Sequence, residues 1–319
     1  MPAPGEHQLL LHVRAVAPQR GEIELVESLD ADAKGPDRSG MIICSDAAGD
    51  VVAVGPKVRG VRVGDKVTSL YLANYVEPPL DAEKQKRAYG YSENGVLGEY
   101  VLLDDTGVAP MPRGYSYVEA AAMPTSSITA WMATVGQGYM RSGDTVLVEG
   151  TGGVSVFALQ FAHAAGARVI VTSSTEDKLA KARELGATEG INYRGTPDWS
   201  ARVLELTHDR GADLVVDVGG KSTIEQSVKS VAYAGTIALV GGLGGYQTTM
   251  PTEPLILHAA SARGVYTGSR ADYLRMLRFV EHHRIHPVIA RTYGLEDYVS
   301  AMRDLAAGNF VGKLVITLP

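Results

Sequence analysis

The chain has 319 residues, more than a single hydrophobic core usually organises, so its length predicts two domains. A formal net charge of −6 gives no general attraction to nucleic acid or anionic membranes, and no apolar run reaches the roughly 18 residues of a membrane helix. The single cysteine, Cys44, excludes an internal disulfide framework and a multi-cysteine zinc site. Because the first residues also lack the segments of a signal peptide, we expect a cytoplasmic protein without a nucleic-acid or membrane partner.

The first hundred residues read mainly as short strands separated by turns. Apolar and alternating segments bounded by glycine and aspartate are typical of such strands. A polar, tyrosine-rich stretch at residues 71–95 predicts a long surface loop, and loops of this length are usually functional or mobile. The predicted strands cover residues 8–13, 41–54, 61–67 and 99–103.

From residue 115 onward the pattern changes to helices and then to alternating strands and helices. This alternation predicts right-handed βαβ units and a parallel sheet covered on both faces. The predicted helices are 117–123, 128–136, 154–165, 176–185, 198–208, 222–232, 271–283 and 296–307, and the strands are 145–149, 168–172, 190–192, 213–217, 236–240, 264–267 and 314–318.

One glycine-rich turn is the most informative motif of the chain. Apolar strand formers lead into Gly150, Gly152 and Gly153, and an apolar-faced helix begins at Val154. Glycines let the backbone approach a pyrophosphate closely, and a helix N-terminus offers unpaired N–H groups. Ser155 replaces the third glycine of G-x-G-x-x-G, but a small residue still allows helix and strand to pack. The segment therefore predicts a dinucleotide-binding turn.

The strand that follows the turn favours NADP(H) over NAD(H). An acid at the end of this strand would bind a free ribose hydroxyl and repel a 2′-phosphate. Here the strand ends in Ser173 and Ser174, and Lys178 follows one helical turn later. Two hydroxyls and a cation suit a phosphate. Ser174 could instead belong to a helix capping box, and Lys178 could be a solvated surface lysine.

Six motifs in register carry a resemblance to a known family. They lie at residues 49–55, 63–67, 128–131, 150–154, 191–194 and 312–315. With them the chain resembles the medium-chain dehydrogenase/reductase superfamily, and within it the zinc-free quinone oxidoreductase-like branch. The resemblance implies an α/β protein: a GroES-like β-barrel-type catalytic domain at 1–114 and 284–319, lacking the usual N-terminal hairpin, and a Rossmann doubly wound parallel sheet at 115–283.

The resemblance also implies which residues meet the cofactor. Thr129 would lie near the nicotinamide as a catalytic and cofactor-binding residue, and Tyr193 near the 2′-phosphate, although Tyr193 could equally be a half-buried strand-end residue. A homodimer would form through the edge strand near Val265. The implied cofactor contacts are Thr129, Gly150, Gly152, Gly153, Val154, Ser173, Ser174, Lys178, Tyr193, Gly241, Gly242, Leu243, Thr267, Gly268, Phe310, Gly312 and Lys313.

The residues that match the family's zinc ligands argue against a metal. Zinc-dependent relatives use a cysteine, a histidine and a further cysteine or aspartate, whereas the matching residues here are Gln19, Ser45 and Thr125. None is a strong zinc ligand, so we expect no zinc. Gln19 and Ser45 are candidates for a catalytic contact with the substrate oxygen, or are structural. Arg20 beside them adds a cation that suits an anionic substrate or faces solvent.

Without a Lewis acid, reduction of an activated acceptor is easier than oxidation of an ordinary alcohol. We therefore expect an NADPH-dependent reductase of a small molecule, either a quinone or an α,β-unsaturated carbonyl compound. A non-catalytic NADPH-binding sensor or scaffold protein is one alternative. A zinc-independent alcohol or carbonyl oxidoreductase is the other.

Overall fold

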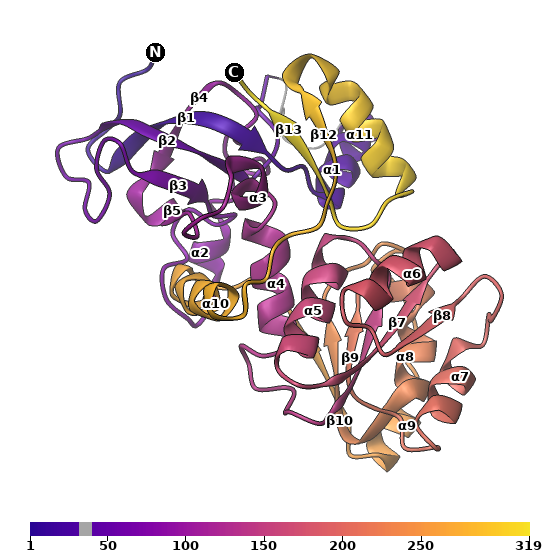
Figure 1. Ribbon diagram of the computed structural model, residues 1–319. Coiled ribbons are helices and arrows are strands. Elements are labelled where there is room, and N and C mark those ends of the chain that lie inside the picture. The colour runs from indigo at the N-terminus through magenta and orange to yellow at the C-terminus, as the bar shows by residue number, and fades with distance from the viewer. Residues whose placement is uncertain (32–39) are drawn as a thin grey trace. The chain divides into compact units, whose positions relative to one another are not determined.

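The computed structural model describes residues 1–31 and 40–319, without the side chains of 26–31 (Figure 1). Contacts divide the chain into two compact units. The first unit comprises Met1–Ile128, Gly268–Asn309 and Lys313–Pro319. The second unit comprises Thr129–Thr267 and Phe310–Gly312. In the described ranges, no helix is both long and apolar enough to cross a bilayer.

The first unit is built on a seven-stranded sheet with the strand order β12-β13-β1-β2-β3-β5, and β4 also pairs with β1. Strand β1 (Gln8–Val16) pairs antiparallel with β2, β4 and β13. Its Leu9, Leu11 and Val13 are fully buried in the core of this unit, as period-two alternation requires. The other strands are β2 (Ala47–Val54), β3 (Lys66–Ser69), β4 (Tyr100–Asp104), β5 (Val108–Pro110), β12 (Ile289–Gly294) and β13 (Lys313–Thr317).

Small residues and caps place the helices of the first unit. Helix α3 (Tyr117–Ala121) begins with a capping box between Ser116 and Glu119, and its alanines pack against Ala15 and Val315. The further helices are α1 (Arg20–Ala31), α2 (Ala82–Gln85), α10 (Arg270–His283) and α11 (Tyr298–Ala307), and α4 (Pro124–Ala133) spans the boundary between the units.

The unit boundaries differ from the expected domain boundaries at 114/115 and 283/284. Residues 115–128 and helix α10 belong to the first unit. The reason lies in contacts that sequence periodicity does not report. Arg270 donates its backbone N–H to the carbonyl of Tyr75 (2.8 Å) and its Nε to that of Val108 (2.7 Å), which ties α10 to the first unit.

The tyrosine-rich stretch at 71–95 is folded onto its own small core. It contains α2, and Leu72, Tyr75 and Ala88 form a buried cluster. Tyr71 and Tyr91 pack edge to face with ring centroids 5.3 Å apart. Because these rings pack against each other, the stretch is more compact than the long surface loop that the sequence predicted.

The second unit is a six-stranded, entirely parallel sheet with the order β11-β10-β9-β6-β7-β8. Read from β8, this is the strand order 3-2-1-4-5-6 of dinucleotide-binding folds. The predicted α/β class with a Rossmann-type parallel sheet is thereby confirmed. The strands are β6 (Thr145–Glu149), β7 (Arg168–Ser173), β8 (Glu189–Asn192), β9 (Ala212–Asp217), β10 (Val231–Leu239) and β11 (Ser261–Gly264), and the helices are α5 (Gly153–Ala164), α6 (Glu176–Glu184), α7 (Trp199–Leu206), α8 (Ile224–Ser230) and α9 (Glu253–Leu257).

The edge strand lies three residues earlier than predicted. Strand β11 covers Ser261–Gly264 rather than 264–267, because Thr236 of β10 pairs with Ser261. Val265 still donates its N–H to the carbonyl of Leu239 (2.8 Å), so the apolar residue that suggested a strand is held at its end.

Candidate functional site

The glycine turn of the second unit has the form that a pyrophosphate needs. Strand β6 is buried throughout, and Gly150 has a φ of +74°, a conformation that side chains disfavour. Gly152 is the N-cap of α5 without a side-chain cap, and a Cβ on it would meet nothing within 4 Å. The Ser155 hydroxyl donates to the carbonyl of Glu149 (2.7 Å), which explains why serine is accepted here. The helix therefore begins toward open space.

Two predicted cofactor segments lie against this turn. Gly312 donates its N–H to the carbonyl of Thr151 (3.0 Å), which places the segment 310–312 beside the turn. The hydroxyls of Thr151 and Ser173 are 3.2 Å apart, so the end of β7 also meets it. Three stretches that are far apart in the sequence thus meet at one edge of the sheet.

The end of β7 and the start of α6 gather positive charge. Burial and the neighbouring charge of Arg194 lower the pKa of Lys178. Thr175, rather than Ser174, caps α6 by accepting the N–H of Lys178 (3.4 Å), so the capping alternative for Ser174 is wrong. Tyr193 is 41% exposed beside Arg194. Arg194, which directly follows the predicted Tyr193, is a neighbouring cation that sequence reasoning did not single out.

The remaining predicted cofactor residues have distinct surroundings. Leu243 is exposed, and its N–H donates to the carbonyl of Val218 (3.3 Å), which brings the segment 241–243 to the turn after β9. Thr267 is buried, and Gly268 belongs to the first unit. The hydroxyl of Thr129 is buried without a hydrogen-bond partner among the described residues.

The three residues that match zinc-ligand positions converge on one carboxylate in the first unit. Asp46 accepts hydrogen bonds from Nε2 of Gln19 (2.5 Å), from the hydroxyl of Ser45 (2.9 Å) and from the hydroxyl of Thr125 (2.5 Å). The backbone N–H of Thr125 adds a fourth bond at 2.9 Å. Asp46 is fully buried, so these bonds replace its hydration.

A second carboxyl group and an ammonium group complete this buried cluster. Glu22 accepts the N–H groups of Gln19 (2.9 Å) and Ser45 (3.1 Å), and burial raises its pKa to about 7. Lys313 donates to the carbonyl of Pro18 (2.9 Å), and its charge acts on Asp46 and Glu22. Helix α1, which carries Glu22, was missed, although the spacing from Gln19 to Glu22 is that of a capping pair.

This placement bears on two other predicted roles. The Lys313 ammonium is buried inside the first unit, where its charge acts on the carboxyl cluster, and its cofactor contact stays a prediction. Arg20 donates to the carbonyls of Leu305 (3.0 Å) and Ala306 (2.5 Å) at the end of α11. A cation there complements the negative end of the helix dipole, which gives Arg20 a structural role.

The chemistry of the cluster does not fit a zinc ion. Zinc sites use thiolate, imidazole and carboxylate ligands, whereas Gln19, Ser45 and Thr125 offer an amide and two hydroxyls that already bind Asp46. Among the side chains that the structure describes, no group of three or more histidine, cysteine, aspartate or glutamate residues could hold a metal ion.

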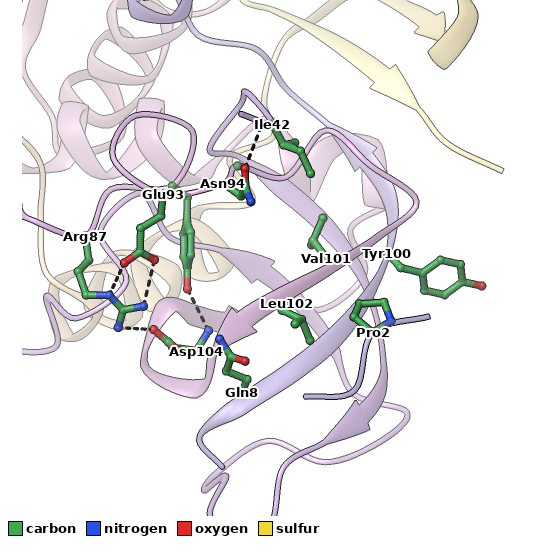
Figure 2. Close-up of a pocket in the computed structure, with 12 residues that line it drawn as sticks. Pro2, Gln8, Ile42, Arg87, Glu93, Asn94, Tyr100, Val101, Leu102 and Asp104 are labelled. Atoms are coloured by element: carbon green, nitrogen blue, oxygen red, sulfur yellow. Dashed lines mark hydrogen bonds and ion pairs between the residues drawn. The ribbon is translucent and has the colours of Figure 1, made fainter. Parts of the chain in front are cut away.

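A separate pocket of about 350 Å³ lies in the first unit beside β4 (Figure 2). Along one wall, Arg87 forms ion pairs with Glu93 and Asp104, and Asn94 accepts the N–H of Ile42 (3.0 Å). None of the individually predicted catalytic or cofactor-binding residues lines this pocket, although Tyr89 of the tyrosine-rich stretch does.

Two family models match the chain. The alcohol dehydrogenase GroES-like domain matches residues 5–113, and the zinc-binding dehydrogenase model matches residues 153–282. A zinc-type alcohol dehydrogenase-like protein of Schizosaccharomyces pombe is 35% identical over 280 residues, which cover 86% of this chain and 81% of that protein. The chain belongs to the medium-chain dehydrogenase/reductase superfamily.

Relatives in this superfamily carry several activities in their names. A quinone oxidoreductase of Pseudomonas aeruginosa is 32% identical over 85% of this chain and 80% of its own length. The crystal structure of an NAD-dependent alcohol dehydrogenase superposes with a TM-score of 0.89 at 34% identity, covering 100% of this chain and 94% of that one. This member of the superfamily is accordingly a nicotinamide-dependent oxidoreductase.

Proposed function

We propose that this protein is a zinc-independent, NADPH-dependent reductase that transfers hydride to a quinone or an α,β-unsaturated carbonyl compound. The observation that carries the proposal is the convergence of Gln19, Ser45 and Thr125 on the carboxylate of Asp46. A carboxylate held by four donors and balanced by Lys313 occupies the surroundings in which zinc relatives hold a metal.

When bound, the nicotinamide supplies the hydride. Gln19 and Thr125 are half-buried, whereas Ser45 and Asp46 are fully buried, so only the first two are open to a substrate. A primary amide has two N–H donors, and Asp46 uses one of them at Gln19. The second can hold the substrate oxygen as negative charge develops on it. Gln19 is thus the catalytic candidate, and Ser45 is a positioning residue.

The preference for NADPH is supported by the charges around β7. Ser173 ends the strand without an acid, and Lys178 and Arg194 lie close enough for their charges to interact. A 2′-phosphate would neutralise both cations, whereas a free ribose hydroxyl would leave them repelling each other. We propose the phosphate contacts at Ser174, Lys178, Tyr193 and Arg194.

We also propose a homodimer through β11. This strand is last in the order of the second unit's sheet, and its outer edge offers backbone groups to a second copy. Ile256 and Leu257 of the neighbouring α9 are 75% and 67% exposed, which adds apolar surface to that region.

Steady-state oxidation of NADPH and NADH with quinones, enones and simple alcohols tests the function. We expect turnover of a quinone or enone with NADPH, unchanged by chelators, in protein free of stoichiometric zinc. Saturable NADPH binding without turnover would favour a sensor or scaffold protein. Zinc-dependent alcohol oxidation would overturn the proposal.

Replacing Gln19 tests the catalytic contact. Gln19→Ala removes the amide donor that would stabilise the developing oxyanion. The variant should therefore have a roughly 100-fold lower kcat with little change in cofactor affinity. The exposed Gln85→Ala in α2 is the matched control and should keep full activity. A variant of Gln19 with normal kcat would remove this residue from the mechanism.

A further inference from the structure

Two carboxyl groups are buried side by side where β6 and β9 end. Glu149 is 3% exposed and Asp217 is fully buried, and both face the buried hydroxyl of Ser227 in α8. The Ser227 oxygen lies 2.5 Å from Oε1 of Glu149 and 2.7 Å from Oδ2 of Asp217. This trio uses no residue that the sequence motifs singled out.

The hydrogens in this trio can be counted. A serine hydroxyl has one proton and can donate it to only one of the two carboxyl groups. Both oxygen–oxygen distances are hydrogen-bond distances, so the second bond needs a proton from a carboxyl group. Within the described residues, neither carboxyl forms an ion pair with a cation, and two adjacent buried carboxylates would be strongly disfavoured.

The surrounding donors indicate which group holds the proton. Oδ1 of Asp217 accepts three bonds, from the N–H groups of Gly219 (3.1 Å) and Gly220 (2.8 Å) and from the hydroxyl of Thr223 (2.9 Å). Glu149 accepts one longer backbone bond, from Val218 (3.3 Å). The Thr223 hydroxyl also lies beside Glu149, but its single proton is donated to Asp217. Three donors favour the ionised form, so Asp217 is the carboxylate and Glu149 the acid. Burial and the charge of Asp217 raise the pKa of Glu149 to about 8.

We propose that neutral Glu149 is a positioning residue for the nicotinamide cofactor, acting through a relay in which Glu149 donates to Ser227 and Ser227 donates to Asp217. The inference rests on the proposed cofactor binding. The carbonyl of Glu149 holds Ser155 in the glycine turn, and Asp217 holds the 219–220 backbone. Gly244 in turn donates to the carbonyl of Gly219 (2.9 Å). The relay therefore joins two predicted cofactor-binding segments.

Deprotonation of Glu149 should weaken cofactor binding. The relay would lose a donor, and a second negative charge would appear beside the turn that is to receive a pyrophosphate. Asp217 on β9 is the charged group that lies against Glu149. On α8, Glu225 and Lys229 pair with each other at 2.8 Å, and Lys221 in the intervening turn is exposed. The pH dependence is thus assigned to Glu149.

Cofactor titrations of the full chain between pH 6.5 and pH 9.5 test this relay. If only the protonated form binds well, the Kd of NADPH rises about tenfold between pH 7 and pH 9. Glu149→Gln keeps a donor to Ser227 but cannot ionise. The Kd of NADPH for this variant should equal that of the wild type at pH 7. It should not show the increase at higher pH that ionisation of Glu149 causes in the wild type. Glu184→Gln, at the exposed end of α6, is the matched control and should follow the wild type.

An infrared difference spectrum gives a second readout that does not depend on the cofactor. At pH 7 the wild type should show the stretching band of a buried protonated carboxyl that Glu149→Gln lacks. Equal pH profiles for the wild type and Glu149→Gln, or no such band, would overturn the proposal. If neither NADPH nor NADH binds any variant, the proposed function and the positioning role both fail, whereas the band would still assign the proton.

Discussion

Each unit of this protein buries two carboxyl groups, but the two units balance that charge differently. In the first unit, Glu22 and Asp46 share the ammonium of Lys313. In the second unit, Glu149 and Asp217 share a hydroxyl, and a proton takes the place of the cation. A buried acid pair can be tolerated by either means, and the raised pKa values of Glu22 and Glu149 make both arrangements depend on pH.

The largest effect should follow from removing the cation. Lys313→Met would remove the positive charge that acts on the buried Glu22 and Asp46. Because, among the described residues, Lys313 acts on them through its charge and not through a direct ion pair, the loss should not exceed the cost of breaking a buried ion pair, about 3–5 kcal/mol. Urea unfolding at pH 7 measures the loss. The exposed Lys181→Met should change the unfolding free energy by less than about 0.5 kcal/mol. A loss of similar size in both variants would show that Lys313 does not balance the cluster.

The second unit should respond unequally to its two acids. Asp217→Asn removes the negative charge from a group that accepts hydrogen bonds from three donors. The free energy of unfolding should fall by roughly 2–3 kcal/mol. Glu149→Gln, which replaces a neutral acid by a neutral amide, should cost less than about 1 kcal/mol at pH 7. Urea unfolding of both variants measures this difference. The reverse order would place the proton on Asp217.

Stability should fall as pH rises. Glu149 and Glu22 have folded-state pKa values of about 8 and about 7 against an ordinary value of 4.5. Their contribution is therefore complete below about pH 4.5 and is lost as pH rises through these values, by up to about 1.4 kcal/mol per pH unit for each group. Thermal unfolding from pH 5 to pH 9 measures the trend. Glu149→Gln should flatten it near pH 8, and an unchanged slope would argue against a raised pKa at Glu149.

The smallest effect concerns Arg194, which we propose binds the 2′-phosphate, in contrast to Lys313, whose charge acts on carboxyl groups inside the protein. Arg194 makes no ion pair with a carboxylate in the described chain, whereas the charge of Lys313 acts on two buried carboxyl groups. Arg194→Ala should raise the Kd of NADPH about tenfold, or about 1.4 kcal/mol, and leave that of NADH unchanged. Arg202→Ala, which removes a surface pair with Glu205, is the control. Equal losses for both cofactors would contradict a phosphate contact.

Local patterns predicted most of the second unit. Strand–helix alternation and the glycines at 150–153 are properties of adjacent residues, so the parallel sheet and its turn follow from them. The structure differs from the local patterns where distant contacts decide. Helix α10 belongs to the first unit because Arg270 binds the carbonyls of Tyr75 and Val108. Strand β11 shifted because its register is set by pairing with β10.

By itself, the sequence determined the superfamily, the two-domain α/β architecture and the dinucleotide turn, because each depends on local spacing. Only the tertiary structure decided what the polar residues do. Gln19 is 27 residues from Asp46, and Thr125 is 79 residues from it, yet the fold brings both side chains to the Asp46 carboxylate. Likewise Glu149 and Ser227 are 78 residues apart, and they share a proton only because β6 and α8 pack together. Charge and proton balance in a buried site depend on neighbours that sequence spacing does not reveal.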